Sequence, residues 1–141
     1  MKKSKSFRLT TILCALFTTG AIVAPTGAAH AAQGGCQPTV YFELDANGFV
    51  TAYPAADCAD NGQYERISIL AVLRVDGEPT GISRPTSYTG QVRDGGVYSG
   101  TGISARNPPG TNAFCTTVTV EWTYYPSTYV MTNKGRTCAY Y

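Results

Sequence analysis

The segment FCTTVTVEWTYY, residues 114–125, identifies this chain as a β protein because apolar and polar side chains alternate along it. A repeat of two residues is the period of a β-strand, whose successive side chains point to opposite faces. One predicted face is apolar and aromatic, and the other carries threonines and one acid: Val118, Val120, Trp122 and Tyr124 against Thr117, Thr119, Glu121 and Thr123. The segment predicts a long antiparallel strand with one face on a core.

A second segment, YERISILAVLRV at 64–75, is the longest apolar stretch beyond residue 31. Its alternate positions form one apolar face, made of Ile67, Ile69, Ala71, Leu73 and Val75. Leu70 and Val72 make the other face apolar as well, which favours a central strand covered on both faces. A buried helix is the alternative, but the β-branched residues and the turn DGEP that follows favour a strand.

Short strand candidates and turn signals fill the rest of the chain. The turn DANG predicts a hairpin between 39–44 and 49–53. The remaining elements are expected to be a loop at 54–62, at most two short strands within 76–96, a strand at 97–105, a loop at 106–112, and strands at 127–132 and 136–141 on either side of NKG. About seven to nine short strands predict an all-β fold, a small antiparallel β-sandwich of immunoglobulin-like or Greek-key type with two disulfides; a small β-barrel is the alternative.

The first 31 residues have the layout of a secretory signal peptide. Residues 1–8 are basic, residues 9–24 are mostly apolar and uncharged, and AHA at 29–31 is a small-x-small cleavage site. The apolar stretch is too short and too broken for a membrane span, which takes about 20 apolar residues. We therefore expect cleavage after Ala31, which gives a signal peptide at 1–31, a single β-sandwich domain at 32–141, and a secreted, extracellular protein.

Cleavage would change the chemistry that the chain offers. It removes His30, the one histidine, and Cys14. The full chain has a formal net charge of +2, whereas residues 32–141 hold seven basic and nine acidic residues, a net charge of −2. Since no basic patch is apparent in the sequence, we expect no nucleic-acid partner, and we expect no membrane span in the mature chain.

Four cysteines remain after cleavage, and in a secreted chain they predict two disulfides. A three-residue loop at 46–48 makes paired residue numbers in the first hairpin sum to 94. A two-residue turn at 126–127 makes them sum to 253 in the last hairpin. Two cysteine pairs satisfy these registers, Cys36 with Cys58 and Cys115 with Cys138. The alternative is a sheet-to-sheet bridge of the immunoglobulin kind.

The composition argues against most catalytic chemistry. Without histidine, the mature chain lacks the usual base of serine and cysteine triads and a common zinc ligand, and oxidised cysteines offer no thiolate. We therefore expect no enzymatic activity, no catalytic residues, no cofactor and no metal. A carboxylate-dependent hydrolase that uses Glu43, Asp45 or Glu121 is the enzymatic alternative. The segment DCADNG at 57–62 fails the EF-hand pattern and is interpreted as an Asx-rich turn.

The tyrosines near the C-terminal end are candidate binding residues. Exposed tyrosines suit protein or sugar contacts because they bring a large contact area at low entropy cost. The candidates are Tyr125, Tyr129, Tyr140 and Tyr141, together with Lys134 and Arg136 in a predicted loop NKGR at 133–136. This loop is a candidate inhibitor loop that offers Lys134 or Arg136 to a trypsin-like pocket. A second candidate, ISRPTS at 82–87, offers Arg84, although Pro85 follows it and would hinder binding.

These observations predict a secreted, non-enzymatic protein-binding module that acts as an inhibitor or as a small subunit of an extracellular protein complex. Its partner is expected to be another extracellular protein. The alternative is a carbohydrate- or cell-wall-binding module that holds a polysaccharide with exposed tyrosines. In general composition the chain resembles small secreted bacterial β-sandwich proteins.

Overall fold

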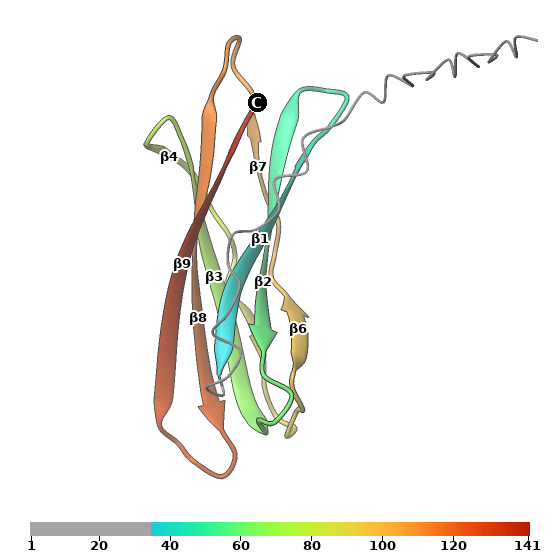
Figure 1. Ribbon diagram of the computed structural model, residues 1–141, viewed down its shortest axis with the longest axis vertical. Helices are drawn as coiled ribbons and strands as arrows, with labels where there is room; N and C mark the ends of the chain where they lie inside the picture. Colours follow the sequence, from blue (N-terminus) through green and yellow to red (C-terminus); the bar gives the residue numbers. More distant parts are fainter. Residues whose placement is uncertain (1–34) are drawn as a thin grey trace, which may run out of the picture.

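Nine β-strands and no helix make up residues 35–141, the part of the chain that the computed structural model describes (Figure 1). The strands are β1 (Cys36–Leu44), β2 (Phe49–Cys58), β3 (Tyr64–Val75), β4 (Glu78–Ile82), β5 (Thr86–Tyr88), β6 (Gly96–Ser99), β7 (Ile103–Arg106), β8 (Ala113–Tyr124) and β9 (Val130–Tyr140). Within this range they form two antiparallel sheets and no closed barrel. The β-sandwich prediction is therefore confirmed, and the barrel alternative is wrong.

The predicted signal peptide at 1–31, with His30 and Cys14, lies outside the described residues. In the described part of the chain, no helix is long and apolar enough to cross a membrane.

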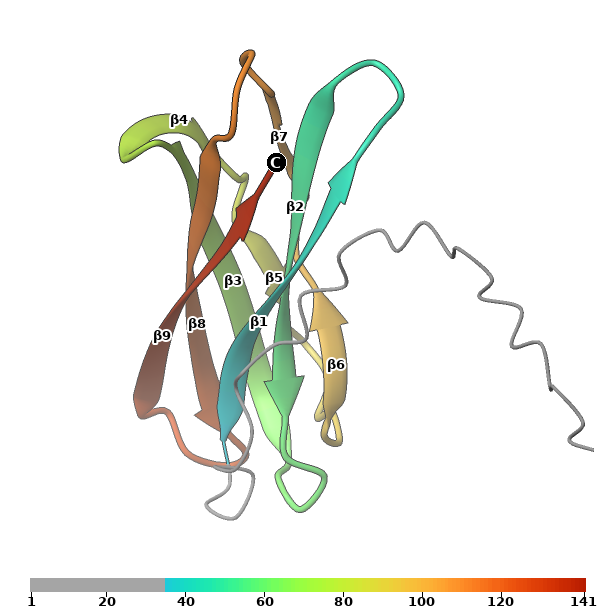
Figure 2. The same ribbon diagram turned by 45° about the horizontal axis from the view of Figure 1, so that its top comes forward.

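The chain passes back and forth between the two sheets. In the first sheet β1 pairs with β2, and both β6 and β7 pair with the other edge of β2. In the second sheet β4 and β5 both pair with one edge of β3, and β8 and β9 follow on its other side. Figure 2 shows the two layers, with β3, β8 and β9 in one and β1, β2 and β6 in the other. The predicted central position of the strand at 64–75 is confirmed.

The core lies between the inward faces of the two sheets. All five residues of the predicted inner face of β3 are buried, namely Ile67, Ile69, Ala71, Leu73 and Val75. They pack with Val118, Val120 and Trp122 of β8 and with Val50, Ala52 and Ala56 of β2. Each large aliphatic side chain buried in this way contributes about 1.5–3 kcal/mol, so the alternation along β3 and β8 accounts for much of the driving force.

Both disulfides join the predicted partners, Cys36 with Cys58 and Cys115 with Cys138. The first bond lies in the core, because Cys36 and Cys58 are 0% and 2% exposed. The second bond lies on the outer face of the second sheet. Cys115 follows Phe114 in β8, and because the Phe114 side chain points into the core, that of Cys115 points outward. The alternative of a bridge between the sheets is wrong.

The first hairpin has the predicted three-residue loop. The Asp45 Oδ1 atom accepts hydrogen bonds from the backbone N–H groups of Asn47 and Phe49, both at 2.8 Å. Gly48 has a φ of 79°, the left-handed conformation that this loop requires. Asp45 therefore supports the turn instead of extending the strand face beyond Leu44.

The last hairpin has the predicted register but a different connection. Thr123 pairs with Val130, and residues 125–129 link the strands in place of the predicted two-residue turn. On the edge of β8 that faces β3, the backbone N–H of Tyr125 donates to the carbonyl oxygen of Gln63, in the loop between β2 and β3.

Two further expectations are corrected. The predicted loop at 54–62 begins too early, because β2 continues to Cys58, where it pairs with both β1 and β6. The predicted strand at 97–105 is two strands, β6 and β7, separated at 100–102. A Cβ on Gly100 would lie 3.0 Å from Ile69 Cγ2 and from Pro54 Cγ, so the chain bends where a glycine permits close packing.

Contacts between the sheets close both lateral edges of the sandwich. On one side the Asn133 side chain of β9 donates to the Gln37 side chain of β1 at 2.8 Å. On the other side the Tyr88 hydroxyl of β5 donates to the carbonyl oxygen of Ser99 in β6 at 2.6 Å. Each lateral edge therefore has a hydrogen bond that links the two sheets.

Candidate functional site

Two tyrosines lie side by side on the outer face of the first sheet. Tyr41 of β1 and Tyr53 of β2 are directly opposed in the strand register. Their ring centroids are 6.2 Å apart and their planes differ by 26°, which is a stacked arrangement. The side chains are 65% and 43% exposed. Large aromatic side chains with this exposure are a preferred element of binding surfaces.

The backbone that carries these rings is fixed at both ends, and one ring lies against a neighbouring glycine. The Cys36–Cys58 disulfide and the hairpin loop close the β1–β2 pair at its two ends. On the side of Tyr53 away from Tyr41, a Cβ on Gly102 would lie 3.3 Å from the tyrosine Cδ1 atom, so the ring rests against this glycine. Preorganised rings lose little conformational entropy when a partner binds.

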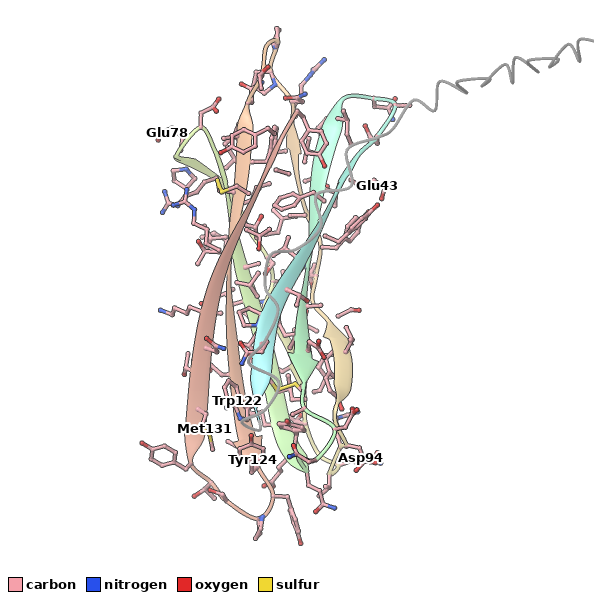
Figure 3. All side chains as sticks on the ribbon, in the orientation of Figure 1. Glu43, Glu78, Asp94, Trp122, Tyr124 and Met131 are labelled. Atoms are coloured by element: carbon pink, nitrogen blue, oxygen red, sulfur yellow. A yellow bond between two sulfur atoms is a disulfide. The ribbon has the colours of Figure 1, made fainter. Side chains whose placement is uncertain are left out.

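Polar groups and a third aromatic ring surround the pair. Glu43 of β1 is opposite Thr51 of β2, and the Thr51 and Ser104 hydroxyls are hydrogen bonded at 2.7 Å. Figure 3 shows Glu43 on the side of the molecule that β1 and β2 form. Phe49, which is 39% exposed, is opposite Arg106 of β7. We call the outward surface formed by Tyr41, Tyr53, Phe49, Glu43, Thr51 and Ser104 the tyrosine face.

The structure does not bring the four predicted binding tyrosines together. Tyr125 and Tyr129 lie in the β8–β9 connection, at one end of the sandwich, and are 54% and 73% exposed. Tyr140 and Tyr141 are at the other end, where the chain finishes (Figure 1). Tyr125 follows the end of β8, so it does not extend the strand face opposite Trp122 as a regular strand would require.

Tyr141 differs from the expected exposed residue. It is half-buried, and its ring packs edge-on against Phe114 with centroids 5.9 Å apart. Burial, and next the negative charge of an ionised Tyr41, raise the pKa of Tyr141. Its backbone N–H and carbonyl are hydrogen bonded to Asn112, so the residue forms part of the packed structure.

The aromatic residues at the other end of the core also have structural roles. Trp122 is 7% exposed, and Figure 3 shows it near Tyr124 and Met131. The ring centroid of the fully buried Tyr64 lies 5.2 Å from that of Tyr124. The Tyr64 hydroxyl donates to the carbonyl oxygens of Gly35 and Ala59 at 3.3 and 3.1 Å. Burial, reinforced by Tyr124, raises the pKa of Tyr64 to about 12.

Lys134 and Arg136 are not in a loop, so this part of the sequence interpretation is wrong. Both lie within β9, opposite Thr119 and Thr117 of β8, and project from the outer face of the second sheet. The pairing between β8 and β9 is continuous through Gly135, which lies against Pro38 of β1. Residues in the middle of an extended edge strand do not form a protease-inhibitor loop.

Arg84 does lie in a connection, residues 83–85 between β4 and β5. Next to it, the buried Ser83 Oγ atom accepts a hydrogen bond from the backbone N–H of Ala71 at 2.9 Å. The Ser83 N–H donates to the carbonyl oxygen of Ala71 at 2.9 Å, so this short connection is fixed to β3.

A shallow hollow of about 180 Å³ lies on the outer face of the second sheet. It is lined by Ser68, Leu70, Pro85, Thr119 and Glu121. Glu121 is the one carboxylate in this lining, whereas Glu43 and Asp45 belong to the first sheet and its hairpin loop. Glu121 therefore lies on a different sheet from Glu43 and Asp45.

No group of three or more histidine, cysteine, aspartate or glutamate side chains in residues 35–141 is arranged to hold a metal ion. In the segment 57–62, Asp57 belongs to β2, and a backbone hydrogen bond from Gly62 to Ala59 closes a turn.

Comparisons of the chain with protein-family models, with curated proteins and with solved structures found no match. The residues themselves are therefore the basis for a functional conclusion. The sequence interpretation missed the tyrosine face, although the signal was present: Tyr41 and Tyr53 also sum to 94 and so oppose each other in the predicted hairpin.

Proposed function

We propose that this chain is a secreted, non-enzymatic binding module that holds an extracellular protein with its tyrosine face. The observation that supports it most is the stacked, exposed pair Tyr41–Tyr53 on a hairpin closed by a disulfide. Tyrosine is enriched among the residues that dominate binding energy at protein interfaces. Glu43 and the Thr51–Ser104 hydroxyls beside the rings supply polar groups of the kind found at interface rims.

Secretion is part of the same proposal. Two disulfides are expected in an oxidising environment, and the basic, apolar and small-residue segments of 1–31 have the order of a signal peptide. The intact mass of the protein from culture medium is expected to match a chain that starts at Ala32 with four oxidised cysteines. A mass that includes residues 1–31 would contradict cleavage.

The test of protein binding is capture of a partner from the organism's own culture medium. The immobilised secreted protein should retain one protein at defined stoichiometry. The double variant Tyr41→Ser/Tyr53→Ser should remain folded and lose that partner, with a cost of about 2 kcal/mol for each hot-spot residue. The matched control is Tyr140→Ser, which removes an equally exposed tyrosine from β9 and should bind normally.

A carbohydrate ligand is the second candidate, because the hydroxyl pair Thr51–Ser104 and the carboxylate of Glu43 lie beside the stacked rings. Sugar rings stack on aromatic side chains and exchange hydrogen bonds with such groups. Retention of the wild-type protein on insoluble polysaccharide, lost in the double tyrosine variant, would favour this candidate over a protein partner. Equal protein capture by the wild type and the double variant would contradict the proposed role of the tyrosine face.

A further inference from the structure

The outer faces of the two sheets carry opposite charge. The strand register gives the second sheet four of the seven cations found in residues 35–141, namely Arg66, Arg74, Lys134 and Arg136. Glu121 is an acid on the same face, and two further acids, Glu65 of β3 and Glu78 of β4, are exposed on strands of this sheet. The outer face of the first sheet carries Glu43 and Asp57, next to the hairpin acid Asp45 and with Arg106 at one corner. The fold thus separates charges that nearly cancel in the composition.

The basic face also has a place for an aromatic ring. Its hollow of about 180 Å³ has apolar walls from Leu70 and Pro85 and polar groups from Ser68, Thr119 and Glu121. The hydrogen bonds between Ser83 and Ala71 hold the wall that carries Pro85. An enclosed cavity of about 150 Å³ accepts a benzene ring, so the volume of this open hollow matches the size of one aromatic ring.

We infer that the partner of the tyrosine face is a second copy of this chain, which receives a ring of the Tyr41–Tyr53 pair in the hollow of its second sheet. This inference rests on the proposed function, since it names the partner of the same face. The Leu70 and Pro85 walls would cover the ring, and the Glu121 carboxylate would accept a hydrogen bond from the tyrosine hydroxyl. Lys134 and Arg136 on one copy have the charge opposite to that of Glu43 and Asp57 on the other.

The two faces differ, so such a contact is heterologous. Each bound molecule keeps one unused tyrosine face or one unused hollow, and the assembly grows head to tail into a ring or an open chain. Because attraction between opposite surface charges contributes, added salt should weaken the association.

Sedimentation velocity of the full secreted protein over a wide concentration range tests this inference. The wild-type protein should associate reversibly, and Tyr41→Ser/Tyr53→Ser should weaken the association at least about tenfold. Lys134→Glu/Arg136→Glu should weaken it as strongly. The control for net charge is Arg106→Glu, which also makes the whole protein more negative but places the new charge beside the tyrosine face. If the two faces attract each other, this variant should associate more strongly. If only the net charge of the protein matters, it should associate more weakly. Circular dichroism tests whether each variant is folded. If Lys134→Glu/Arg136→Glu is not folded, the single variant Lys134→Glu replaces it in the measurement.

A mixing experiment distinguishes head-to-tail contact from other modes. The double tyrosine variant keeps its hollow, and the double charge variant keeps its tyrosine face. Each should be monomeric alone, and an equimolar mixture should form 1:1 dimers and nothing larger. A wild-type protein that stays monomeric at every concentration, or a mixture that stays monomeric, would overturn the inference. If the wild type is monomeric but the tyrosine variants lose a partner from the medium, the proposed function stands and self-association fails.

Discussion

Gly135 of β9 lies against Pro38 of β1 so closely that a Cβ on the glycine would be 2.7 Å from the proline Cγ atom. This contact joins the two sheets at one lateral edge, next to the hydrogen bond between Asn133 and Gln37. The proline ring cannot move away easily, because β1 is held by its pairing with β2 along its whole length.

Gly135→Ala should therefore destabilise the protein by about 1–3 kcal/mol, the usual cost of overpacking. The measurement is the free energy of unfolding in urea. The control is Thr132→Ala, an exposed position on the same strand, which should stay within about 0.5 kcal/mol of the wild type. Equal stability of the two variants would show that the sheets can separate at this edge without cost.

Tyr64→Phe should cost about 0.5–1.5 kcal/mol, because it removes the buried hydroxyl that donates to the carbonyl oxygens of Gly35 and Ala59, each of which keeps a backbone N–H donor. Thermal or urea unfolding at neutral pH measures this loss. Tyr88→Phe is a comparison at a more exposed hydroxyl, which donates to Ser99, and should cost less.

The raised pKa of Tyr64 also predicts a pH dependence. Its pKa is about 12 in the folded protein against an ordinary value of 10.0, so the folded state favours the protonated phenol. This contribution to stability is fully present below pH 10 and is lost as the pH rises from 10 towards 12. Unfolding free energies measured across this range should fall more steeply for the wild type than for Tyr64→Phe. Parallel slopes would contradict the assignment.

The two disulfides should differ in their resistance to reduction. Cys36 and Cys58 are buried in the core, whereas Cys138 is partly exposed on the outer face of the second sheet. A mild reductant under native conditions should open Cys115–Cys138 first, because attack requires access to a sulfur atom. Alkylation followed by peptide mapping identifies the opened bond. Earlier labelling of Cys36 or Cys58 would be the contrary result.

Adjacent C-terminal tyrosines should respond differently to substitution. Tyr141→Ser should destabilise the protein by about 1–3 kcal/mol, because the ring packs on Phe114 and is half-buried. Tyr140→Ser should change stability by less than about 0.5 kcal/mol, since that side chain is 68% exposed. Thermal melts of the two single variants provide the comparison, and similar melting temperatures would contradict the different packing of the two rings.

Local pattern was sufficient to predict much of the fold. The alternation in 64–75 and 114–125 predicted two long strands and their inner faces, and the turn DANG fixed the register that brings Cys36 to Cys58. These features depend on neighbours in sequence. The division of 97–105 into β6 and β7 depends on Gly100 meeting Ile69 of the opposite sheet, a contact that no local pattern contains.

The candidate site was harder to predict for the same reason. The C-terminal tyrosines are close in sequence, but the length of β9 separates Tyr129 from Tyr140. The basic face needs strands from distant parts of the chain, because Arg66 belongs to β3 and Lys134 to β9. Composition gives only the net charge of the chain. The order of the strands in each sheet is needed to predict on which face each charged side chain lies.

The hairpin disulfides also determine how the molecule would respond to mechanical tension. The described chain begins at one end of the long axis and finishes at the other (Figure 1). A chain pulled along its length would transmit force across each sulfur–sulfur bond, bypassing the segments between cysteines 22 and 23 residues apart. These bypassed segments would keep about 150 Å of chain from extending, at roughly 3.4 Å per residue. Tyr41 and Tyr53 lie inside one of them, and Lys134 and Arg136 inside the other, whereas Arg66 and Arg74 lie in the part of the chain that would bear the force.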